Sequence, residues 1–165
     1  MRNLIIYASS TTELIAREID DLLVEKATII DAKILLESKI EIDFSTYDNI
    51  ILGTNVLFNR VSHSFKKCAK LLNANFLFKT EKPNIYCYIA GCDYDNADDV
   101  ASEVAVTLKG NPIVFFVGGS LADNGLQGLK GLILGKIAKS NMENVTPIDH
   151  NKIQRIAEMV NGTIL

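Results

Sequence analysis

One pattern constrains the fold of this chain more than any other: short apolar runs of strand length alternate with segments of helical period. The apolar runs are Asn3 to Tyr7, Ala27 to Ile30, Asn49 to Leu52, Asn84 to Ala90 and Pro112 to Val117. All five are continuous apolar stretches, which is typical of strands buried on both faces. The alternation predicts an α/β sandwich of three layers around a parallel sheet.

The segments between these runs have the period of amphipathic helices. The predicted helices are Thr11 to Val24, Ala32 to Lys39, Ser62 to Leu72, Asp98 to Leu108 and Asp149 to Val160. Right-handed crossovers then favour a five-stranded parallel sheet in the order 2-1-3-4-5. In such a sheet the ligand site lies at the carboxyl ends of the strands, where the order reverses. Because neither a linker nor a repeat interrupts the pattern, we expect one domain over residues 1–165.

Composition excludes several functions. A formal net charge of -3 offers no broad cationic surface, so nucleic acid is not an expected partner. Three cysteines and two histidines lack the spacing of metal ligands, and neither G-x-G-x-x-G nor HExxH occurs. No apolar run approaches the roughly 18 residues of a membrane-spanning helix, and no basic leader precedes the first strand. We therefore expect a cytoplasmic protein with reduced thiols.

The loop after the first predicted strand lies in the sequence YASSTTELIARE. Its four hydroxyl side chains are Ser9, Ser10, Thr11 and Thr12. Hydroxyls at a helix N-terminus, together with its free N–H groups, are suited to bind a phosphate. However, Ser10 and Glu13 also have the S-x-x-E spacing of a capping box, in which each side chain bonds the other residue's amide. The turn is either a phosphate loop or an ordinary capped helix start.

The loop after the third predicted strand has the sequence GTNVLFNRVSH. Its candidate ligand contacts are Thr54, Asn55, Val56, Leu57 and Phe58. Phe58 is suited to stack on an aromatic ring, although Leu57 and Phe58 can equally pack as core beneath the loop. His63 can donate a proton near a ligand, or it can simply open a helix behind a Ser62 cap.

The loop after the fourth predicted strand, GCDYDN, supplies Gly91, Cys92 and Tyr94. Tyr94 is suited to stack on a ring, and nearby amides can reach polar ring atoms. The alternative is a turn before the next helix, with Asp95 or Asn96 as its cap.

Two stretches carry a family resemblance. In YDNIILGTNVLFNRVSHSFKK a strand ends at Gly53, an aromatic follows at Phe58, and His63 and Phe65 open the next helix. In VGGSLADNGLQGLKGLILGKIAK a strand ends in a glycine pair that leads into a long helix. With these features the chain resembles a flavodoxin-like domain, and within that superfamily it is similar to the flavodoxin-type, menaquinone-dependent protoporphyrinogen oxidases.

The resemblance implies a three-layer flavodoxin-like sandwich that holds FMN, with the phosphate at Ser9 to Thr12 and the ring between the other two loops. It also implies a redox partner, namely a quinone, a porphyrinogen or a protein. The family's loop, T-x-T-G-x-T, is about two residues longer and contains a glycine, which supplies positive φ angles. Two functions therefore stay open: an FMN-dependent oxidoreductase or electron carrier, or a flavodoxin-fold module that binds no flavin and acts in binding or protein interaction.

The segment Leu121 to Ser140 carries an apolar stripe whose members are Leu126, Leu129, Ile133 and Ile137. Packing on the sheet accounts for most of this stripe. The functional alternatives are a homodimer contact or a peripheral membrane contact, since lysines accompany the apolar side.

Overall fold

The computed structural model describes residues 1–38, 42–57, 60–76, 82–91, 97–119 and 147–164. Its parallel strands are β1 (Asn3–Tyr7), β2 (Ala27–Asp31), β3 (Asn49–Leu57), β5 (Asn84–Ala90) and β6 (Ile113–Gly118). They pair in the order β2-β1-β3-β5-β6, while the short strand β4 (Arg60–Val61) pairs only with β3, in the antiparallel sense. The five predicted strands therefore have the predicted order 2-1-3-4-5.

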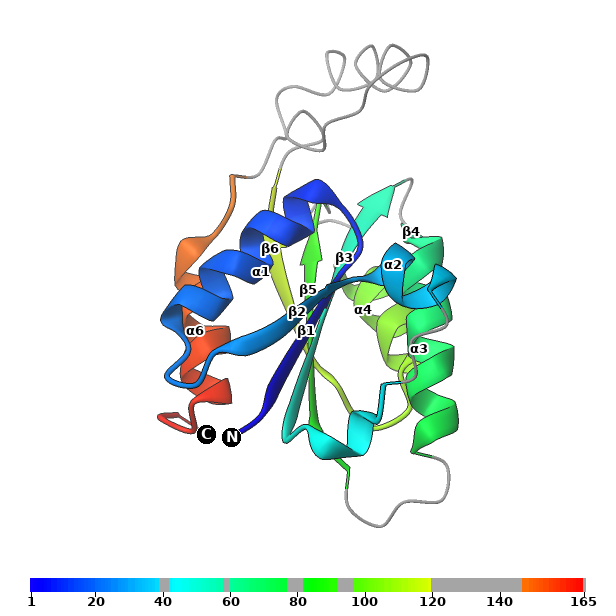
Figure 1. Cartoon of the computed structure of the whole chain (residues 1–165). Helices are drawn as coiled ribbons and strands as arrows, with labels where there is room; N and C mark the ends of the chain where they lie inside the picture. The colour runs from blue at the N-terminus through cyan, green and yellow to red at the C-terminus, as the bar shows by residue number, and fades with distance from the viewer. Residues whose placement is uncertain (39–41, 58–59, 77–81, 92–96, 120–146, 165) are drawn as a thin grey trace, which may run out of the picture.

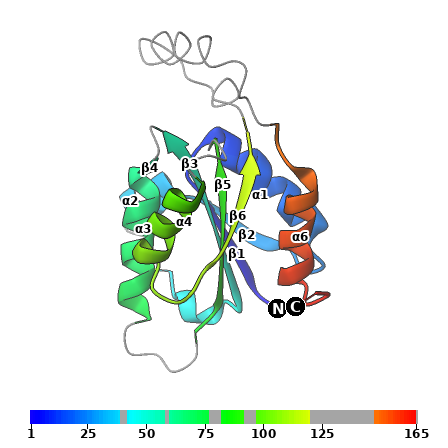
Figure 2. The same ribbon diagram turned by 180° about the vertical axis from the view of Figure 1, so that it is seen from behind.

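Helices cover both faces of the sheet, as the alternation predicts (Figures 1 and 2). On one face lie α1 (Ser10–Leu22) and α6 (His150–Val160). On the other lie α2 (Ala32–Glu37), α3 (His63–Asn75) and α4 (Ala97–Thr107). A short 3-10 helix, η1 (Phe44–Thr46), precedes β3. The carboxyl ends of the strands lie at the top of Figure 1, and both chain termini lie at the bottom.

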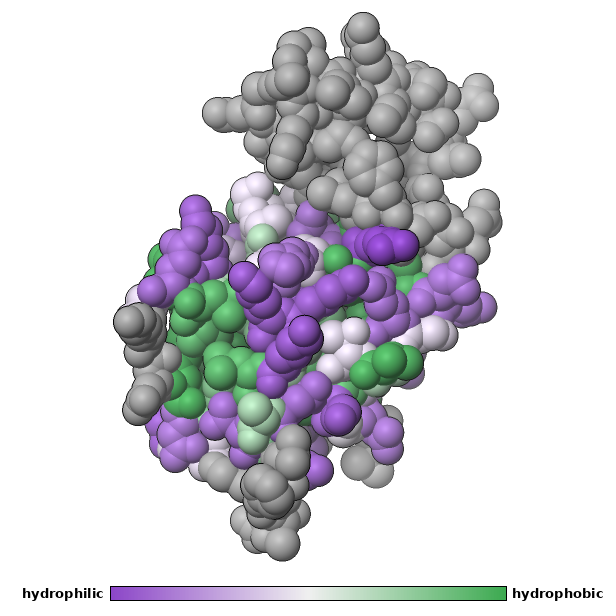
Figure 3. Space-filling view, turned by 90° about the vertical axis from the view of Figure 1, so that its right-hand side faces the viewer, coloured by the Kyte–Doolittle hydropathy of each residue, from purple (hydrophilic) through white to green (hydrophobic). Residues whose placement is uncertain are grey.

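Figure 3 shows the face of α2, α3 and α4, where hydrophilic side chains surround a patch of hydrophobic ones. The helices there are amphipathic: α3 buries Phe65, Cys68 and Leu72 against the sheet. Ile34 of α2 and Leu71 of α3 remain exposed. The buried side of each helix supplies the packing that stabilises it.

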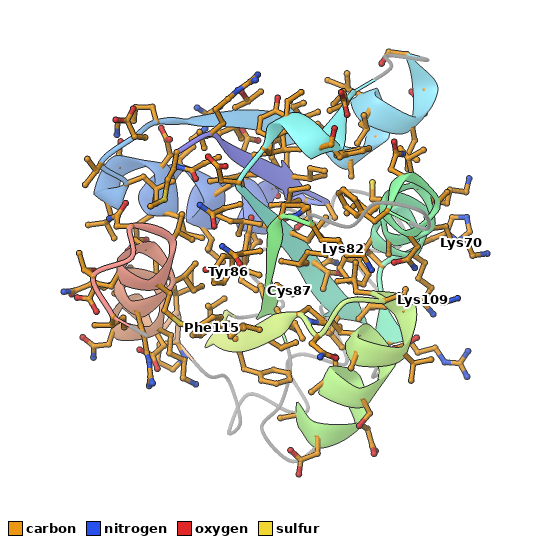
Figure 4. All side chains as sticks on the ribbon, turned by 90° about the horizontal axis from the view of Figure 1, so that it is seen from below. Lys70, Lys82, Tyr86, Cys87, Lys109 and Phe115 are labelled. Carbon is orange, nitrogen blue, oxygen red and sulfur yellow. The ribbon has the colours of Figure 1, made fainter. Side chains whose placement is uncertain are left out.

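Strand β5 runs through the middle of the core, and its side chains alternate between the two faces. Tyr86 and Tyr88 belong to the hydrophobic cluster beneath α1 and α6, whereas Cys87 and Ile89 belong to the cluster beneath α3 and α4. Figure 4 shows Tyr86 on the α6 side, with Cys87 beside it on the same strand. Both faces of β5 are thus buried, as predicted.

The outer strands differ from the prediction of burial on both faces. Most residues of β2 and β6 are only partly buried, and Thr28 and Ile113 are exposed. Each of these strands has a neighbour on one side alone, so the layers cover it incompletely. A continuous apolar run does not reveal which strand lies at an edge.

The amino end of the sheet is closed by three asparagines in register on β1, β3 and β5, which we call the asparagine ladder: Asn3, Asn49 and Asn84. Asn49 donates to the amide oxygen of Asn3 (2.9 Å), and Asn84 donates to that of Asn49 (3.0 Å). Asn3 in turn donates to the carbonyl of Glu25 (2.8 Å). The ladder joins three strands and the loop before β2.

Candidate functional site

The candidate site lies at the carboxyl edge of the sheet, where the neighbouring strands β1, β3 and β5 end (Figure 1). The β1–α1 turn consists of Ala8 and Ser9, and α1 begins at Ser10. Ser9 is the N-cap, and its hydroxyl accepts from the Thr12 amide (3.3 Å). The Thr12 hydroxyl accepts from the Ser9 amide in return (2.8 Å). The chain thus forms a capping box of Ser9 and Thr12.

The predicted capping box of Ser10 and Glu13 is therefore wrong by one residue. Ser10 is exposed in the first turn of α1, and Glu13 pairs instead with Arg17 one turn further along (2.7 Å). The physical reason is that the Thr12 hydroxyl accepts from the Ser9 amide, so the box closes one residue earlier and Ser9 takes the cap position.

Thr12 is fully buried, and its hydroxyl is the centre of the turn. It accepts from two consecutive amides, those of Ala8 (3.0 Å) and Ser9 (2.8 Å), and it donates to the Ser9 carbonyl (2.9 Å). The Ser9 hydroxyl lies 3.1 Å from it as well, and because a hydroxyl has one donor and two acceptor sites, these contacts use its whole capacity. The two amides converge on one oxygen atom, as they would on an oxygen of an anion, but the oxygen that they hold belongs to the chain itself.

Tyr88 of β5 reaches the same turn from below. Its ring is fully buried, and its hydroxyl donates to the Thr12 carbonyl (2.6 Å). Burial raises the pKa of Tyr88 well above its ordinary value, so the phenol stays a donor. The ring lies against Gly53 of β3, the strand between β5 and β1. A Cβ at position 53 would lie 2.2 Å from the Tyr88 ring, so only glycine leaves room for it.

The second loop begins later than predicted. The third strand does not end at Leu52 or Gly53; β3 continues to Leu57 and turns back into β4, with Val56 opposite Val61. The loop residues predicted to contact a ligand from Thr54 to Leu57 thus lie in a strand of this hairpin. The extension occurs because β4 and the upper part of β5 supply partners for β3 beyond the predicted end.

Thr54 and Asn55 lie on opposite faces of this extension, and both are buried. The Thr54 hydroxyl accepts from the Ser62 amide (3.2 Å) and lies 3.2 Å from the Ser62 hydroxyl. Ser62 is the N-cap of α3, as one of the two interpretations predicted, and its hydroxyl accepts from the Phe65 amide (3.3 Å). His63 follows it as an exposed residue in the first turn of α3. Thr54 therefore fixes the hairpin to the helix.

Glu103 of α4 ties the same hairpin from the other side. It accepts from the Val61 amide (3.2 Å) and forms an ion pair with Lys66 of α3. Burial alone would raise the pKa of Glu103, but the bonds from Lys66 and Val61, together with the charges of Lys66 and Arg60, lower it overall. The charged carboxylate of Glu103 therefore stabilises the hairpin.

The third loop starts at Gly91, whose φ of 76° lies in the left-handed region that favours glycine. Its amide donates to the carbonyl of Gly118 at the end of β6 (3.0 Å). This bond joins the residue that follows β5 to the last residue of β6.

Val56 is buried in the hydrophobic cluster under α3, against which Ala8 of the β1–α1 turn also packs. Several predictions fall outside the described residues: Phe58, Cys92, Tyr94, the caps Asp95 and Asn96, and the segment Leu121 to Ser140.

Sequence reasoning missed two tyrosines of this region. Tyr7 is the last residue of β1, paired in register with Asp31 of β2. Burial, followed by the charges of Glu13 and Asp31, raises its pKa. Tyr88 is the other, and its place three residues before Gly91 was available in the sequence. What the sequence lacked was any sign that the side chain reaches across β3 to the first turn of α1.

The described residues contain no group of side chains that could hold a metal ion. Among them, Cys68 and Cys87 are buried free thiols. Burial, with the charge of Asp31, raises the pKa of Cys68 to about 11, so this thiol is unreactive at neutral pH. None of the helices in the described part of the chain has the length and apolar character needed to traverse a lipid bilayer.

No family profile and no curated protein matches this sequence. Solved structures do match the fold. An oxidoreductase from Corynebacterium diphtheriae superposes with a TM-score of 0.59 at 13% identity, covering 99% of this chain and 96% of that one. Oxidised flavodoxin 1 from Bacillus cereus superposes with a TM-score of 0.56 at 14% sequence identity, and the match covers 100% of both chains. A flavoprotein in complex with FMN from Lactobacillus acidophilus superposes with a TM-score of 0.53 at 14% sequence identity, and the match covers 74% of this chain and 95% of that one.

At these identities the likeness concerns the fold. The chain has the flavodoxin-like fold: a parallel sheet in the order 2-1-3-4-5 between two helical layers, with its crossover point at the β1–α1 turn. Which ligand occupies that point depends on the residues of the turn, because one fold serves many functions.

Proposed function

We propose that the protein binds FMN at the carboxyl edge of its sheet and acts as an electron-transfer flavoprotein. The observation that carries this proposal is the pair of amides of Ala8 and Ser9, whose N–H groups converge on a single oxygen atom, that of the Thr12 hydroxyl, beside the N-terminus of α1. Such a pair, at the positive end of a helix, is a suitable cradle for a phosphate oxygen. Structures of the same fold include a flavodoxin and an FMN complex, which supports the choice of ligand.

In this proposal the chain's residues bind and orient, while the flavin supplies the redox chemistry when bound. The Ser9 and Ser10 hydroxyls and the turn amides hold the phosphate. The end of β3 and Gly91, which follows β5, flank the ring. The partner is a quinone, a porphyrinogen or a redox protein, and the first two follow from the resemblance to the protoporphyrinogen oxidases.

An FMN titration tests the proposal. We expect quenching of flavin fluorescence and a rise in the melting temperature that grows with FMN concentration, because a ligand that binds the folded state stabilises it. Millimolar FMN that causes neither change would contradict flavin binding.

A charge placed at Ser10 locates the phosphate. Ser10 is exposed in the first turn of α1, where an aspartate favours the helix but repels an anion. Ser10→Asp should weaken FMN binding by about tenfold, the factor for about 1.4 kcal/mol, with little change in stability. The matched control is Ser102→Asp, which makes the same charge change on an exposed residue of α4. Equal affinities of the two variants would place the phosphate elsewhere.

A second function, a flavodoxin-fold module that binds no flavin and acts in protein interaction, is favoured by the Thr12 hydroxyl. It already fills the cradle with three hydrogen bonds. Lengthening the turn by two residues including a glycine distinguishes the cases. If the turn alone prevents binding, the longer turn should bind FMN where the natural chain does not. Absence of binding in both chains would favour the interaction module.

A further inference from the structure

The β1–α1 turn is held from within the sheet by a residue that belongs to another strand. Tyr88 is separated from Thr12 by 76 positions, yet its hydroxyl donates to the Thr12 carbonyl at 2.6 Å. The tyrosine is fully buried, and the missing side chain of Gly53 gives its ring the room to reach α1. A buried phenol that meets a helix carbonyl is a fixed anchor, because leaving the hydroxyl without a partner there is costly.

Thr12, whose carbonyl Tyr88 binds, is also the residue whose hydroxyl occupies the amides of Ala8 and Ser9. The carbonyl of Thr12 bonds to Tyr88, while its hydroxyl bonds to the amides of Ala8 and Ser9. Tyr88 therefore fixes the distance between the first turn of α1 and the end of β1, and with it the position of the Thr12 hydroxyl. In the proposed function, the phosphate of FMN would compete with this hydroxyl for the same two amides.

We infer that Tyr88 is a positioning residue which, through Thr12, keeps the turn in its closed form and thereby sets the preference between phosphorylated and unphosphorylated flavin. The inference rests on the proposed function, since it concerns the same turn. When a ligand binds only a less populated form of a protein, its apparent affinity is reduced by the fraction of molecules in that form. Loosening the anchor raises that fraction, and it does so for FMN but not for riboflavin, which carries no phosphate.

The first test needs no flavin. Tyr88→Phe removes the hydroxyl but keeps the ring in its place beside Gly53. We expect the amides of Thr12 and Glu13, which close the first turn of α1, to exchange with solvent about tenfold faster, the factor for a lost hydrogen bond of about 1.4 kcal/mol. The control is Tyr86→Phe, on the same face of the same strand one pair of residues earlier. Unchanged exchange in Tyr88→Phe, or equal acceleration in both variants, would overturn the positioning role.

The second test compares FMN with riboflavin. In Tyr88→Phe the affinity ratio of FMN to riboflavin should rise by several-fold, up to about tenfold, whereas Tyr86→Phe should leave it unchanged. A loss of general packing would move both affinities alike and leave the ratio constant, and that result would overturn the inference. Thr12→Val, which removes the competing hydroxyl, should shift the ratio in the same direction; Tyr88→Phe decides if that variant does not fold.

The two hypotheses fail differently. If neither flavin binds the natural chain or Tyr88→Phe, the proposed function fails, while the exchange rates still decide whether Tyr88 positions the turn. If FMN binds and the exchange rates do not differ, flavin binding stands and the anchor is wrong.

Discussion

The two ends of the parallel sheet satisfy their polar groups in opposite ways. At the amino end, the asparagine ladder of Asn3, Asn49 and Asn84 joins three strands by side-chain bonds. At the carboxyl end, the polar groups of the β1–α1 turn bond one another within a span of five residues, from Ala8 to Thr12. The bonds of the ladder run between paired strands, whereas those from Ala8 to Thr12 lie outside the strand pairing.

This difference shows where a ligand can be accommodated. Exchanging a partner in the turn changes local bonds and leaves the strand pairing intact, while exchanging one in the ladder leaves a buried amide unpaired between strands. Helix N-termini also point to the carboxyl end, which favours anions there. The anchor of Tyr88 on Thr12 is one bond at that end that spans distant positions, since it ties the turn to the sheet as the ladder ties strands together.

The largest loss of stability is expected at Gly53, whose missing side chain leaves room for the Tyr88 ring. Gly53→Ala would place a Cβ 2.2 Å from the buried Tyr88 ring, so the strand or the ring must move. Overpacking of this kind should cost about 3 kcal/mol, to be measured by urea unfolding. In a Tyr88→Leu background the same substitution should cost at least about 1 kcal/mol less, because the ring is gone. Equal costs in both backgrounds would contradict the close contact.

The middle rung of the ladder should come next. Asn49→Ala leaves the Asn3 amide oxygen and one Asn84 donor without their present partner, and Asn49 is buried. The expected loss is about 2 kcal/mol of unfolding free energy. Asn84→Ala, at the exposed end of the ladder, should cost less than half as much. FMN affinity should not change in either variant. A large change would contradict the assignment of ligand binding to the carboxyl end of the sheet alone.

The hairpin at the carboxyl end should tolerate the loss of one hydroxyl better. Thr54→Val keeps the shape of the side chain but removes the oxygen that accepts from the Ser62 amide. We expect a loss of about 1 kcal/mol, measured by thermal unfolding. Thr54→Ser keeps the hydroxyl and should retain its bond to Ser62. If the serine variant loses more stability than the valine variant, packing and not the hydrogen bond holds the hairpin.

The smallest effect concerns pH. The pKa of Glu103 is lowered in the folded state, so its stabilisation is fully present above the unfolded pKa, near 4.5, and is lost as the pH falls through the lower folded value. Because Lys66 and Glu103 are partly exposed, the contribution should be about 0.5 kcal/mol. Glu103→Gln should therefore lose less stability than the natural chain between pH 5 and about 3. Parallel pH profiles would show that the ion pair contributes nothing.

Much of the fold could be predicted because its signals are local. The bounds of β1 and β5 agree with the predicted strands, and the remaining ends differ mostly by one to three residues. The large miss is β3, which extends to Leu57 because β4 and β5 supply its partners. Hairpin pairing depends on chain reversal beyond the apolar run, which the periodicity does not record.

The candidate site was predictable in place but less so in detail. The order 2-1-3-4-5 directs attention to the β1–α1 turn, and the hydroxyls at Ser9 to Thr12 were recognised there. Which serine caps the helix was predicted wrongly, since Ser9 and Ser10 both precede a suitable partner. The sequence therefore shows which hydroxyl residues stand at this turn, while their bonds and the approach of Tyr88 are seen only in the structure.

Sequence patterns alone were enough to predict the order of strands and helices along the chain, to favour the sheet order 2-1-3-4-5, and to show that the turn YASSTTE contains no glycine. These are properties of neighbouring residues and of chain connectivity. The tertiary structure decided which oxygen fills the turn and what holds it there. Thr12 closes on Ala8 and Ser9 within the turn, but it is Tyr88, brought across Gly53 by strand pairing, that fixes it, because contacts between distant positions exist only once the sheet has formed.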